Sequence, residues 1–255
     1  QDQSALHVTA RRDDGYHLIE SLAVFTRFGD RLSLSSADRD DFSVTGKYAA
    51  NVPTDASNLV LRARDALRTD FGADRCPPVA ISLEKNLPVA SGVGGGSSDA
   101  AAALSGLSRL WNLDSDGSKL AHIGLLLGAD VPMCLAARPL VARGIGDRLD
   151  MLSGFAPLAF VLVNPGVAVG TTDVFRALTS RDNDALPAPP RSIDFHRLRN
   201  WLDLTRNDLQ KTAEALAPPI GAAIRALERV DAGFARMSGS GATCFGLFET
   251  GNVAK

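Results

Sequence analysis

The spacing of hydrophobic residues along the chain predicts both helices and strands. Over residues 58–71, apolar side chains recur on one helical face, and Ser57 or Asn58 can cap the start. Residues 79–84 read Val-Ala-Ile-Ser-Leu-Glu, a pattern typical of a strand. This predicted strand leads into the most glycine-rich stretch of the chain.

The same reasoning predicts elements along the rest of the chain. Strands are expected over residues 5–9, 18–28, 30–35, 138–148 and 155–164, with a closing hairpin formed by 233–237 and 244–248. Helices are expected over residues 98–111, 118–127, 194–204, 208–216 and 219–230. Residues 182–190 hold three prolines and predict a linker or mobile loop. Because the two kinds of element do not alternate regularly, we predict an α+β fold with two subdomains, residues 1–150 and 151–255.

Composition excludes several classes of protein. The 255 residues are 45% hydrophobic and carry a net charge of −2, which gives no general attraction to nucleic acid or to an anionic membrane. The longest apolar runs, such as residues 155–163, are too short to span a bilayer, and the start of the sequence does not resemble a signal peptide. Cys76, Cys134 and Cys244 are odd in number and far apart, which disfavours a disulfide framework or a zinc site. We therefore expect a cytoplasmic enzyme with neither nucleic acid nor membrane as a partner.

The glycine-rich stretch predicts a binding site for an anion. Glycines at positions 92, 94, 95 and 96 precede Ser97, Ser98 and Asp99 and then a run of alanines. Glycine allows sharp turns and close approach to a ligand, and alanine favours a helix. We expect Ser97, Ser98 or Asp99 to cap that helix. The unpaired amides and the positive dipole end of the helix start then point at one place, which suits a phosphate.

The common phosphate-binding loops do not match this stretch. A Walker A loop requires a lysine after its last glycine, whereas Ser97 follows Gly96 here. Neither register of the dinucleotide fingerprint is complete, because Ser97 or Asp99 stands where the third glycine is needed. Protein-kinase loops lie between two strands rather than before a helix. The alternative is an ordinary turn before a core helix, although three consecutive glycines are costly to order for a turn alone.

Two further segments are candidates for chemistry. Asp130 lies between a predicted helix end and Pro132, where it could act as a general base or metal ligand, or only cap a helix in a surface turn. Residues 237–244 alternate glycine and hydroxyl side chains between two apolar segments. They could form a hairpin turn, a second loop that approaches the substrate, or both.

These three segments, in this order, resemble the motifs of the GHMP kinase superfamily, which phosphorylates small-molecule alcohols. The phosphate-loop motif matches residues 88–100 and the late glycine motif matches residues 238–243. The extra glycine and Asp99, together with residues 128–132 and the Arg12-Asp-Asp-Gly-Tyr-His17 segment, are similar to the member that acts on a cytidylyl sugar alcohol in non-mevalonate isoprenoid biosynthesis. The resemblance covers essentially the whole chain and implies a two-subdomain GHMP-kinase-like fold with the active-site cleft between the subdomains.

The resemblance also implies a role for individual residues. Asp130 would accept the proton of the substrate hydroxyl as it attacks the γ-phosphate of ATP. Tyr16 and Phe175 would stack on the two faces of cytosine, and His17 would hydrogen-bond its polar edge. The remaining residues would contact either ATP or the acceptor. Those expected at ATP are Pro88, Gly92, Gly94, Gly95, Gly96, Ser97, Ser98, Asn58 and Lys85; those expected at the acceptor are Thr171, Gly239, Ser240 and Gly241.

ATP and Mg²⁺ are the expected cofactors, since the metal neutralises phosphate charge. Its protein ligands are not identified, although Ser98 and Asp99 lie near the expected place. The resemblance is compatible with a monomer or a weak homodimer. Taken singly, Tyr16, His17 and Phe175 also fit ordinary structural positions.

One feature departs from the motif pattern. The superfamily member begins with a strand that carries a lysine and an asparagine, and alignment on His17 places Gln1 and Gln3 there. Gln-Asp-Gln-Ser is not typical of the start of a buried strand, and we expect that natural residues before Ala5 are missing from the sequence. The alternatives are another small-molecule GHMP kinase, a nucleotide-binding homologue with impaired catalysis, or a structural α+β domain that uses glycines for turns.

Overall fold

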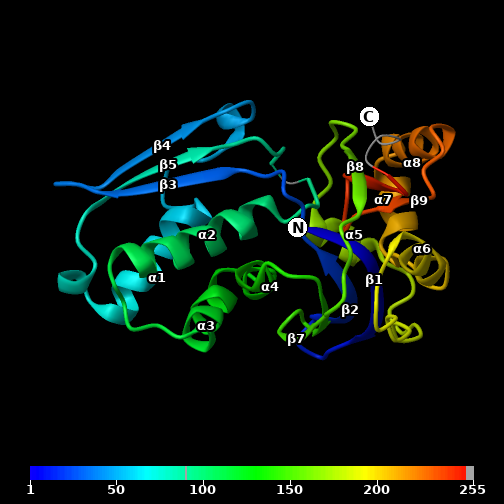
Figure 1. Cartoon of the computed structure of the whole chain (residues 1–255), viewed down its shortest axis with the longest axis horizontal. Helices are drawn as coiled ribbons and strands as arrows, with labels where there is room; N and C mark the ends of the chain where they lie inside the picture. The colour runs from blue at the N-terminus through cyan, green and yellow to red at the C-terminus, as the bar shows by residue number, and fades with distance from the viewer. Residues whose placement is uncertain (90, 251–255) are drawn as a thin grey trace. The chain divides into compact units, whose positions relative to one another are not determined.

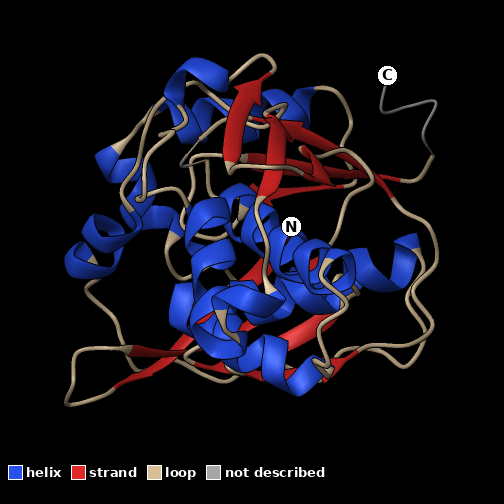
Figure 2. Cartoon of the chain, turned by 90° about the vertical axis from the view of Figure 1, so that its left-hand side faces the viewer, coloured by secondary structure: helices blue, strands red, loops and turns tan. Residues whose placement is uncertain are grey.

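The structure is a computed structural model in which residues 1–89 and 91–250 are described. Helices and strands are mixed along the chain (Figure 2), which confirms the predicted α+β class. The chain forms two compact units, each of which collects segments distant in sequence. Unit 1 contains the described residues of 1–25, 90–93 and 138–255, and unit 2 contains residues 26–89 and 94–137.

Unit 1 contains two antiparallel sheets (Figure 1). The first, in the order β1-β2-β6-β7, is built from β1 (Asp2–Arg11), β2 (His17–Val24), β6 (Leu140–Gly144) and β7 (Arg148–Met151). The second, in the order β8-β10-β9, is built from β8 (Ala159–Val163), β10 (Cys244–Phe248) and β9 (Phe234–Met237). The helices of unit 1 are α5 (Thr171–Ala177), α6 (Phe195–Asp203), α7 (Gln210–Leu216) and α8 (Pro219–Arg229).

The division predicted at residue 150 differs from these units. β2 pairs with β6 over five residues, and β1 is hydrogen-bonded to the turn at residues 206–208. The N-terminal strands and the C-terminal third of the chain therefore share one unit. A single boundary could not be read from the chain because the units are assembled by pairing between distant segments.

The sequence-based expectation that Gln-Asp-Gln-Ser does not start a buried strand is wrong. β1 begins at Asp2, and Asp2, Gln3 and Ser4 are all buried although their sequence is polar. The strand ladder satisfies the backbone, since Asp2 pairs with Val24 and Gln3 with Ala23. Ser4 Oγ donates to Asp2 Oδ1 at 2.8 Å, while Oδ2 has no hydrogen-bond partner among the described residues. Burial raises the pKa of the Asp2 carboxyl to about 6.

The proline-rich loop of residues 182–190 has neither helix nor strand, as predicted, but several hydrogen bonds hold it within unit 1. His7 Nε2 accepts from Arg206 N–H, so Nδ1 carries the proton and donates to Asp184 O at 3.0 Å. Leu186 N–H donates to Glu20. The indole of Trp201 donates to two carbonyls of the loop. The sequence shows the prolines but not these distant partners.

Unit 2 is a three-stranded sheet with helices on one face. The sheet order is β3-β5-β4, in which β5 pairs antiparallel with β3 and parallel with β4. The helices α1 and α2 pack against each other, and α2 contacts β3 (Figure 1). The strands are β3 (Arg31–Ser36), β4 (Asp41–Thr45) and β5 (Val79–Glu84); the α-helices are α1 (Leu59–Phe71), α2 (Gly95–Leu110), α3 (Gly117–Leu127) and α4 (Val131–Ala136); the 3₁₀ turns are η1 (Ala49–Asn51) and η2 (Ala73–Arg75).

Most predicted elements are present, with instructive exceptions. Asn58 caps α1 by accepting from Val60 N–H, as one of the two predicted caps. The strand predicted over residues 138–148 is instead a hairpin, because Gly144 and Gly146 adopt positive φ and turn the chain between β6 and β7. The short elements β4, α4 and α5 were not predicted, nor were the 3₁₀ turns η1 and η2 or the strand β7 that closes this hairpin.

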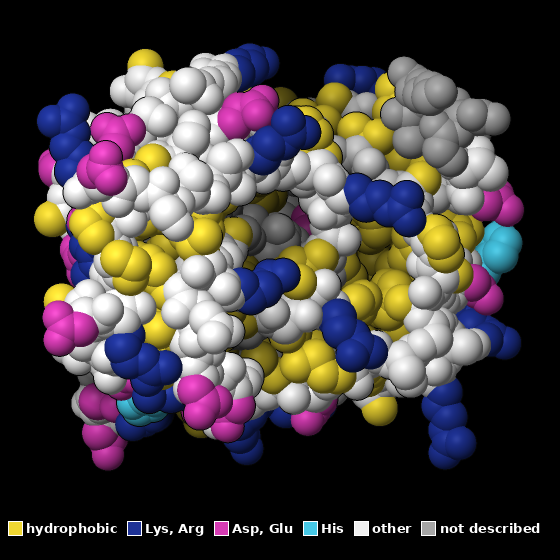
Figure 3. Space-filling view, turned by 60° about the vertical axis from the view of Figure 1, so that its left-hand side comes forward, with side chains coloured by type: hydrophobic (Ala, Val, Ile, Leu, Met, Phe, Trp, Pro, Cys, Tyr) yellow, Lys and Arg dark blue, Asp and Glu magenta, His cyan; other side chains and the backbone are white. Residues whose placement is uncertain are grey.

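The surface drawn in Figure 3 mixes both signs of charge. Side chains of both charges, Lys and Arg as well as Asp and Glu, are scattered over that face, with hydrophobic side chains between them. Among the described residues, no helix combines the length and apolar character needed to cross a bilayer.

Candidate active site

The phosphate-loop motif ends at the start of α2 in unit 2. Gly94 is the N-cap residue, in the left-handed conformation with φ 59°, and the helix begins at Gly95. The predicted cap at Ser97, Ser98 or Asp99 is therefore wrong, because the glycines start the helix earlier. A glycine cap offers no side chain to the first-turn amides of Gly95 and Gly96, which lack intrahelical acceptors. These amides are the donors that an anion would use.

Lys85 lies buried beside this helix start, between two carboxylates. Its Nζ donates to Asp30 Oδ2 at 2.5 Å and to Asp99 Oδ2 at 2.7 Å, and the Lys85 side chain is only 4% exposed. A Cβ added to Gly95 would lie 3.3 Å from Nζ, so the ammonium directly faces the first residue of α2. Burial raises the pKa of Asp99 to about 6, although Lys85 opposes the rise.

Asp30 extends this cluster into the chain that leads to the motif. Its second oxygen, Oδ1, accepts from Asn86 N–H at 2.6 Å and from Leu87 N–H at 2.8 Å. Pro88 follows directly. The cluster thus fixes the backbone on one side of the glycine loop and the helix on the other.

Asn58 has a structural role in unit 2. Its side chain caps α1 and also donates to Pro53 O at 2.7 Å, and the residue is buried. A Cβ on Gly96 would contact Leu59 at 3.5 Å, which brings the starts of α1 and α2 together. The expected contacts of Asn58 and Lys85 with adenosine stay predictions.

Asp130 precedes α4 and is partly exposed. It is the N-cap residue, yet its side chain makes no cap hydrogen bond, so the helix-capping alternative does not occupy its carboxylate. Burial raises the pKa of Asp130 above its ordinary value. A carboxylate that has a raised pKa and makes no capping hydrogen bond is suited to abstract a proton.

In unit 1, Ser91 and Gly92 of the phosphate-loop motif contact the late glycine segment, residues 238–243. Gly92 has φ +75°, and a Cβ there would lie 2.7 Å from the carbonyl carbon of Gly241. Ser238 Oγ donates to Gly92 O, and Thr243 N–H donates to Ser91 O at 3.0 Å. The two glycine motifs, about 150 residues apart in sequence, are therefore one structural feature.

A hydroxyl pair joins two segments expected at the acceptor. Thr171 Oγ1, at the start of α5, lies 2.8 Å from Ser240 Oγ. Thr243 lies in the late glycine segment with Ser240, and its Oγ1 accepts a hydrogen bond from Asn164 Nδ2 at 2.9 Å. These contacts bring Thr171 together with Gly239, Ser240 and Gly241.

The aromatic residues form a second group at the turn between β1 and β2. His17 stacks on Phe175 with ring centroids 5.0 Å apart and planes inclined by 29°. Tyr16 precedes His17 and is 61% exposed, with its hydroxyphenyl ring accessible. Burial, and then the charges of Arg11 and Arg181, lower the pKa of His17, which favours the neutral ring. Its Nε2 is buried and has no hydrogen-bond partner among the described residues.

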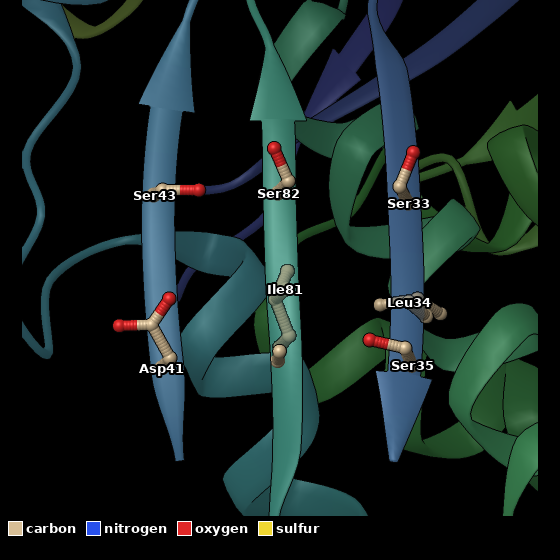
Figure 4. A pocket seen from close by; sticks show the side chains of 8 residues that line it. Ser33, Leu34, Ser35, Asp41, Ser43, Ile81 and Ser82 are labelled. Atoms are coloured by element: carbon tan, nitrogen blue, oxygen red, sulfur yellow. The ribbon is translucent and has the colours of Figure 1, made fainter. Parts of the chain in front are cut away.

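Unit 2 also has a hollow on its three-stranded sheet. Figure 4 shows it over the three strands, lined by the hydroxyls of Ser33, Ser43 and Ser82 and by Asp41. None of the predicted site residues lines it. The hollow therefore belongs to the face of the sheet rather than to the candidate site.

Sequence reasoning missed two residues that support the site. Asp30 anchors Lys85 from 55 residues away. Asn207 donates to two carbonyls of the late glycine segment. The Gly29-Asp30 and Asn207-Asp208 dipeptides resemble ordinary turn signals, so no local pattern distinguishes them.

The comparisons with known proteins identify the family of the chain. The model of the GHMP kinases N terminal domain matches residues 58–138, and that of the GHMP kinases C terminal domain matches residues 185–255. The chain belongs to the GHMP kinase family, and its fold is the two-subdomain fold of that family.

Within the family, the relatives point to one member. A Mesorhizobium japonicum protein named 4-diphosphocytidyl-2-C-methyl-D-erythritol kinase is 69% identical over 98% of this chain and 85% of its own length. The protein of the same name from Brucella melitensis is 56% identical over 96% of this chain and 82% of its own length. A crystal structure of 4-(cytidine 5'-diphospho)-2C-methyl-D-erythritol kinase matches 99% of this chain and 89% of that chain, with a TM-score of 0.78 and 30% identity. Homoserine kinase from Cytophaga hutchinsonii shares the fold, with a TM-score of 0.69 and 20% identity over 100% of this chain and 87% of its own.

Proposed function

We propose that the chain is an enzyme that transfers the γ-phosphoryl group of ATP to the 2-hydroxyl of 4-diphosphocytidyl-2-C-methyl-D-erythritol, in the non-mevalonate route to isoprenoid precursors. The observation that carries this proposal is the 69% identity, over 98% of the chain, to a kinase of that name. The residues described above include groups of the kinds that such a reaction needs, and each is proposed a role below.

ATP binding is assigned to the glycine motif. Phosphoryl transfer depends mainly on positioning and on stabilising charge. The first-turn amides of α2 at Gly95, Gly96 and Ser97, together with the hydroxyl of Ser98, are proposed to receive the phosphates, with Gly92 and Gly94 shaping the approach. Pro88 leads into the loop, while Asn58 and Lys85 are proposed near adenosine.

Mg²⁺ is proposed to enter with ATP. No cluster of three or more His, Cys, Asp or Glu side chains able to hold a metal exists among the described residues. This fits Mg²⁺, which is commonly held by substrate phosphates with few protein ligands. Ser98 Oγ donates to Cys134 and keeps lone pairs for a metal, whereas Asp99 Oδ2 is already paired with Lys85. When bound, the ion would neutralise phosphate charge.

The acceptor is assigned to unit 1. Tyr16 and Phe175 are proposed to sandwich cytosine, and the neutral ring of His17 is suited to hydrogen-bond its polar edge. Thr171, Gly239, Ser240 and Gly241 are proposed to contact the ribose or diphosphate. Asp130 is proposed to take the proton of the attacking hydroxyl, which its raised pKa favours.

We further propose that the enzyme works in the cytoplasm, as a monomer or a weak homodimer. The three cysteines, all among the described residues, are buried and form no disulfide with one another, as suits a reducing compartment. The test of function offers purified protein and Mg-ATP a panel of the cytidylyl substrate, mevalonate and homoserine, with products identified by mass. Phosphorylation of the cytidylyl substrate supports the proposal; turnover of only mevalonate or homoserine assigns the chain to another branch of the family.

A further inference from the structure

A buried asparagine stands between β1 and the late glycine segment of unit 1. Asn207 follows α6 and lies beside Leu6 of β1 in an isolated parallel bridge. Leu6 N–H donates to Arg206 O at 3.0 Å, and Asp208 N–H donates to Leu6 O at 2.9 Å. These two bonds fix the backbone of Asn207 to the strand.

The side chain of Asn207 uses its hydrogen-bonding groups within the protein. Nδ2 donates to Met237 O at 2.9 Å and to Gly239 O at 2.8 Å, and Oδ1 accepts from Leu209 N–H at 3.0 Å. The residue is 8% exposed. A side chain at this place therefore needs two donors and one acceptor in an amide arrangement, which aspartate cannot supply.

The two carbonyls flank the start of a segment that has neither helix nor strand. Residues 238–243 lie outside the ladder that joins β9 to β10. Ser238, between the two carbonyls, accepts from Gln3 N–H and donates to Gly92 O. Backbone hydrogen bonds from Gly239 N–H to Gln3 O and from Thr243 N–H to Ser91 O also hold the segment, and Asn207 adds two side-chain bonds at its start.

We propose that Asn207 is a positioning residue for substrate binding. It holds the backbone at Met237 and Gly239, which sets the place of Ser240 and, through Ser238, of Gly92. This inference rests on the proposed function, in which the segments at Gly92 and Gly239–Gly241 bind ATP and the acceptor. Nothing in the chemistry of Asn207 requires contact with substrate.

The test uses Asn207→Asp, which keeps the acceptor for Leu209 N–H and removes both donors. The matched control is Asn183→Ala, because the Asn183 amide also donates two hydrogen bonds in unit 1, to Val8 O and to Asp208 Oδ2, but none to the late glycine segment. Steady-state kinetics with the cytidylyl substrate and Mg-ATP, melting temperature, and amide hydrogen exchange over residues 238–243 are measured for each protein. If the aspartate variant is insoluble, Asn207→Ser, which keeps one donor and the acceptor, replaces it.

We expect Asn207→Asp to raise KM for the cytidylyl substrate about tenfold or more and to speed exchange over residues 238–243, while Asn183→Ala changes neither. If both variants lower the melting temperature alike and leave KM and exchange unchanged, the positioning role is overturned. If the wild-type protein does not phosphorylate the cytidylyl substrate, the proposed function fails, and the exchange comparison alone decides whether Asn207 positions the segment.

Discussion

Gly92 lies so close to the backbone of Gly241 in unit 1 that no side chain fits at Gly92. A Cβ on Gly92 would lie 2.7 Å from the carbonyl carbon and 2.9 Å from the nitrogen of Gly241. Both residues have positive φ. Glycine is therefore required at position 92 by the backbone of Gly241, whereas a Cβ on Gly241 would instead lie 2.7 Å from Met237 Sδ.

Replacement of Gly92 by alanine is therefore expected to destabilise the protein by about 3 kcal/mol, through backbone strain and overlap. Gly166→Ala is the matched control, since Gly166 has the same φ of +75° but no atom within 4 Å of its added Cβ. The control should lose only about 1 kcal/mol. Urea unfolding measures both. Equal losses would mean that the Gly92–Gly241 contact adds nothing beyond the strain of positive φ.

Lys85→Met is expected to destabilise unit 2 by about 3–5 kcal/mol, because it leaves Asp30 and Asp99 buried without their cation. The loss should be larger at pH 8 than at pH 5, since burial raises the pKa of Asp99 to about 6 and this carboxyl can bind a proton at low pH. Lys119→Met is the control: Lys119 pairs with Asp70 at 2.7 Å, but both side chains are about two-fifths exposed. It should cost less than about 1 kcal/mol. Denaturant unfolding at both pH values measures the free energy of unfolding of each variant. If Lys85→Met also lowers it by less than about 1 kcal/mol, Lys85 does not stabilise the buried cluster as described.

Asp2→Asn is expected to stabilise the protein at pH 8 and to have less effect at pH 4. The folded pKa of Asp2 is about 6, above the ordinary 3.8, so the folded state binds the proton more tightly. Stability from this group is full below the ordinary value and falls as the pH rises from about 4 to about 6. The gain at pH 8 is up to about 3 kcal/mol. Melting temperatures across pH 4–8 check it; a gain independent of pH would show that the carboxyl does not titrate in this window.

Tyr16→Ala is expected to raise KM for the cytidylyl substrate about tenfold to a hundredfold, because stacking on one base contributes about 1–3 kcal/mol. The melting temperature should barely change, since Tyr16 is 61% exposed. Phe28→Ala removes an equally exposed aromatic ring, 64% exposed, from outside the candidate site. It should leave KM unchanged. An unchanged KM in the Tyr16 variant would remove this ring from the acceptor site.

The sequence predicts those parts of the fold whose signal is local. The helix α1 is predicted with its cap because its apolar face and Asn58 lie within 14 residues. The strand β4 was missed since only Phe42 and Val44 alternate in it, and α4 and α5 were missed because each spans only six or seven residues.

The candidate site shows the same limit. The glycine motifs and the Tyr16-His17 pair are recognisable as motifs, but the partners that fix them are not. Asp30 reaches Lys85 and Asn207 reaches Gly239 only after the chain has folded. The polar start of β1 was misjudged because pairing with β2 outweighs the cost of burying Asp2 and Ser4.

The most direct test of the account compares wild-type protein with Asp130→Asn in phosphoryl transfer from Mg-ATP to 4-diphosphocytidyl-2-C-methyl-D-erythritol, with ATP affinity measured on both by calorimetry. We predict that the wild type forms the 2-phosphate, and that the variant binds ATP normally but turns over at least about a hundredfold more slowly, as expected for loss of a general base. A wild-type protein that binds ATP without phosphorylating this alcohol, or an Asp130→Asn variant of undiminished kcat, would contradict the account.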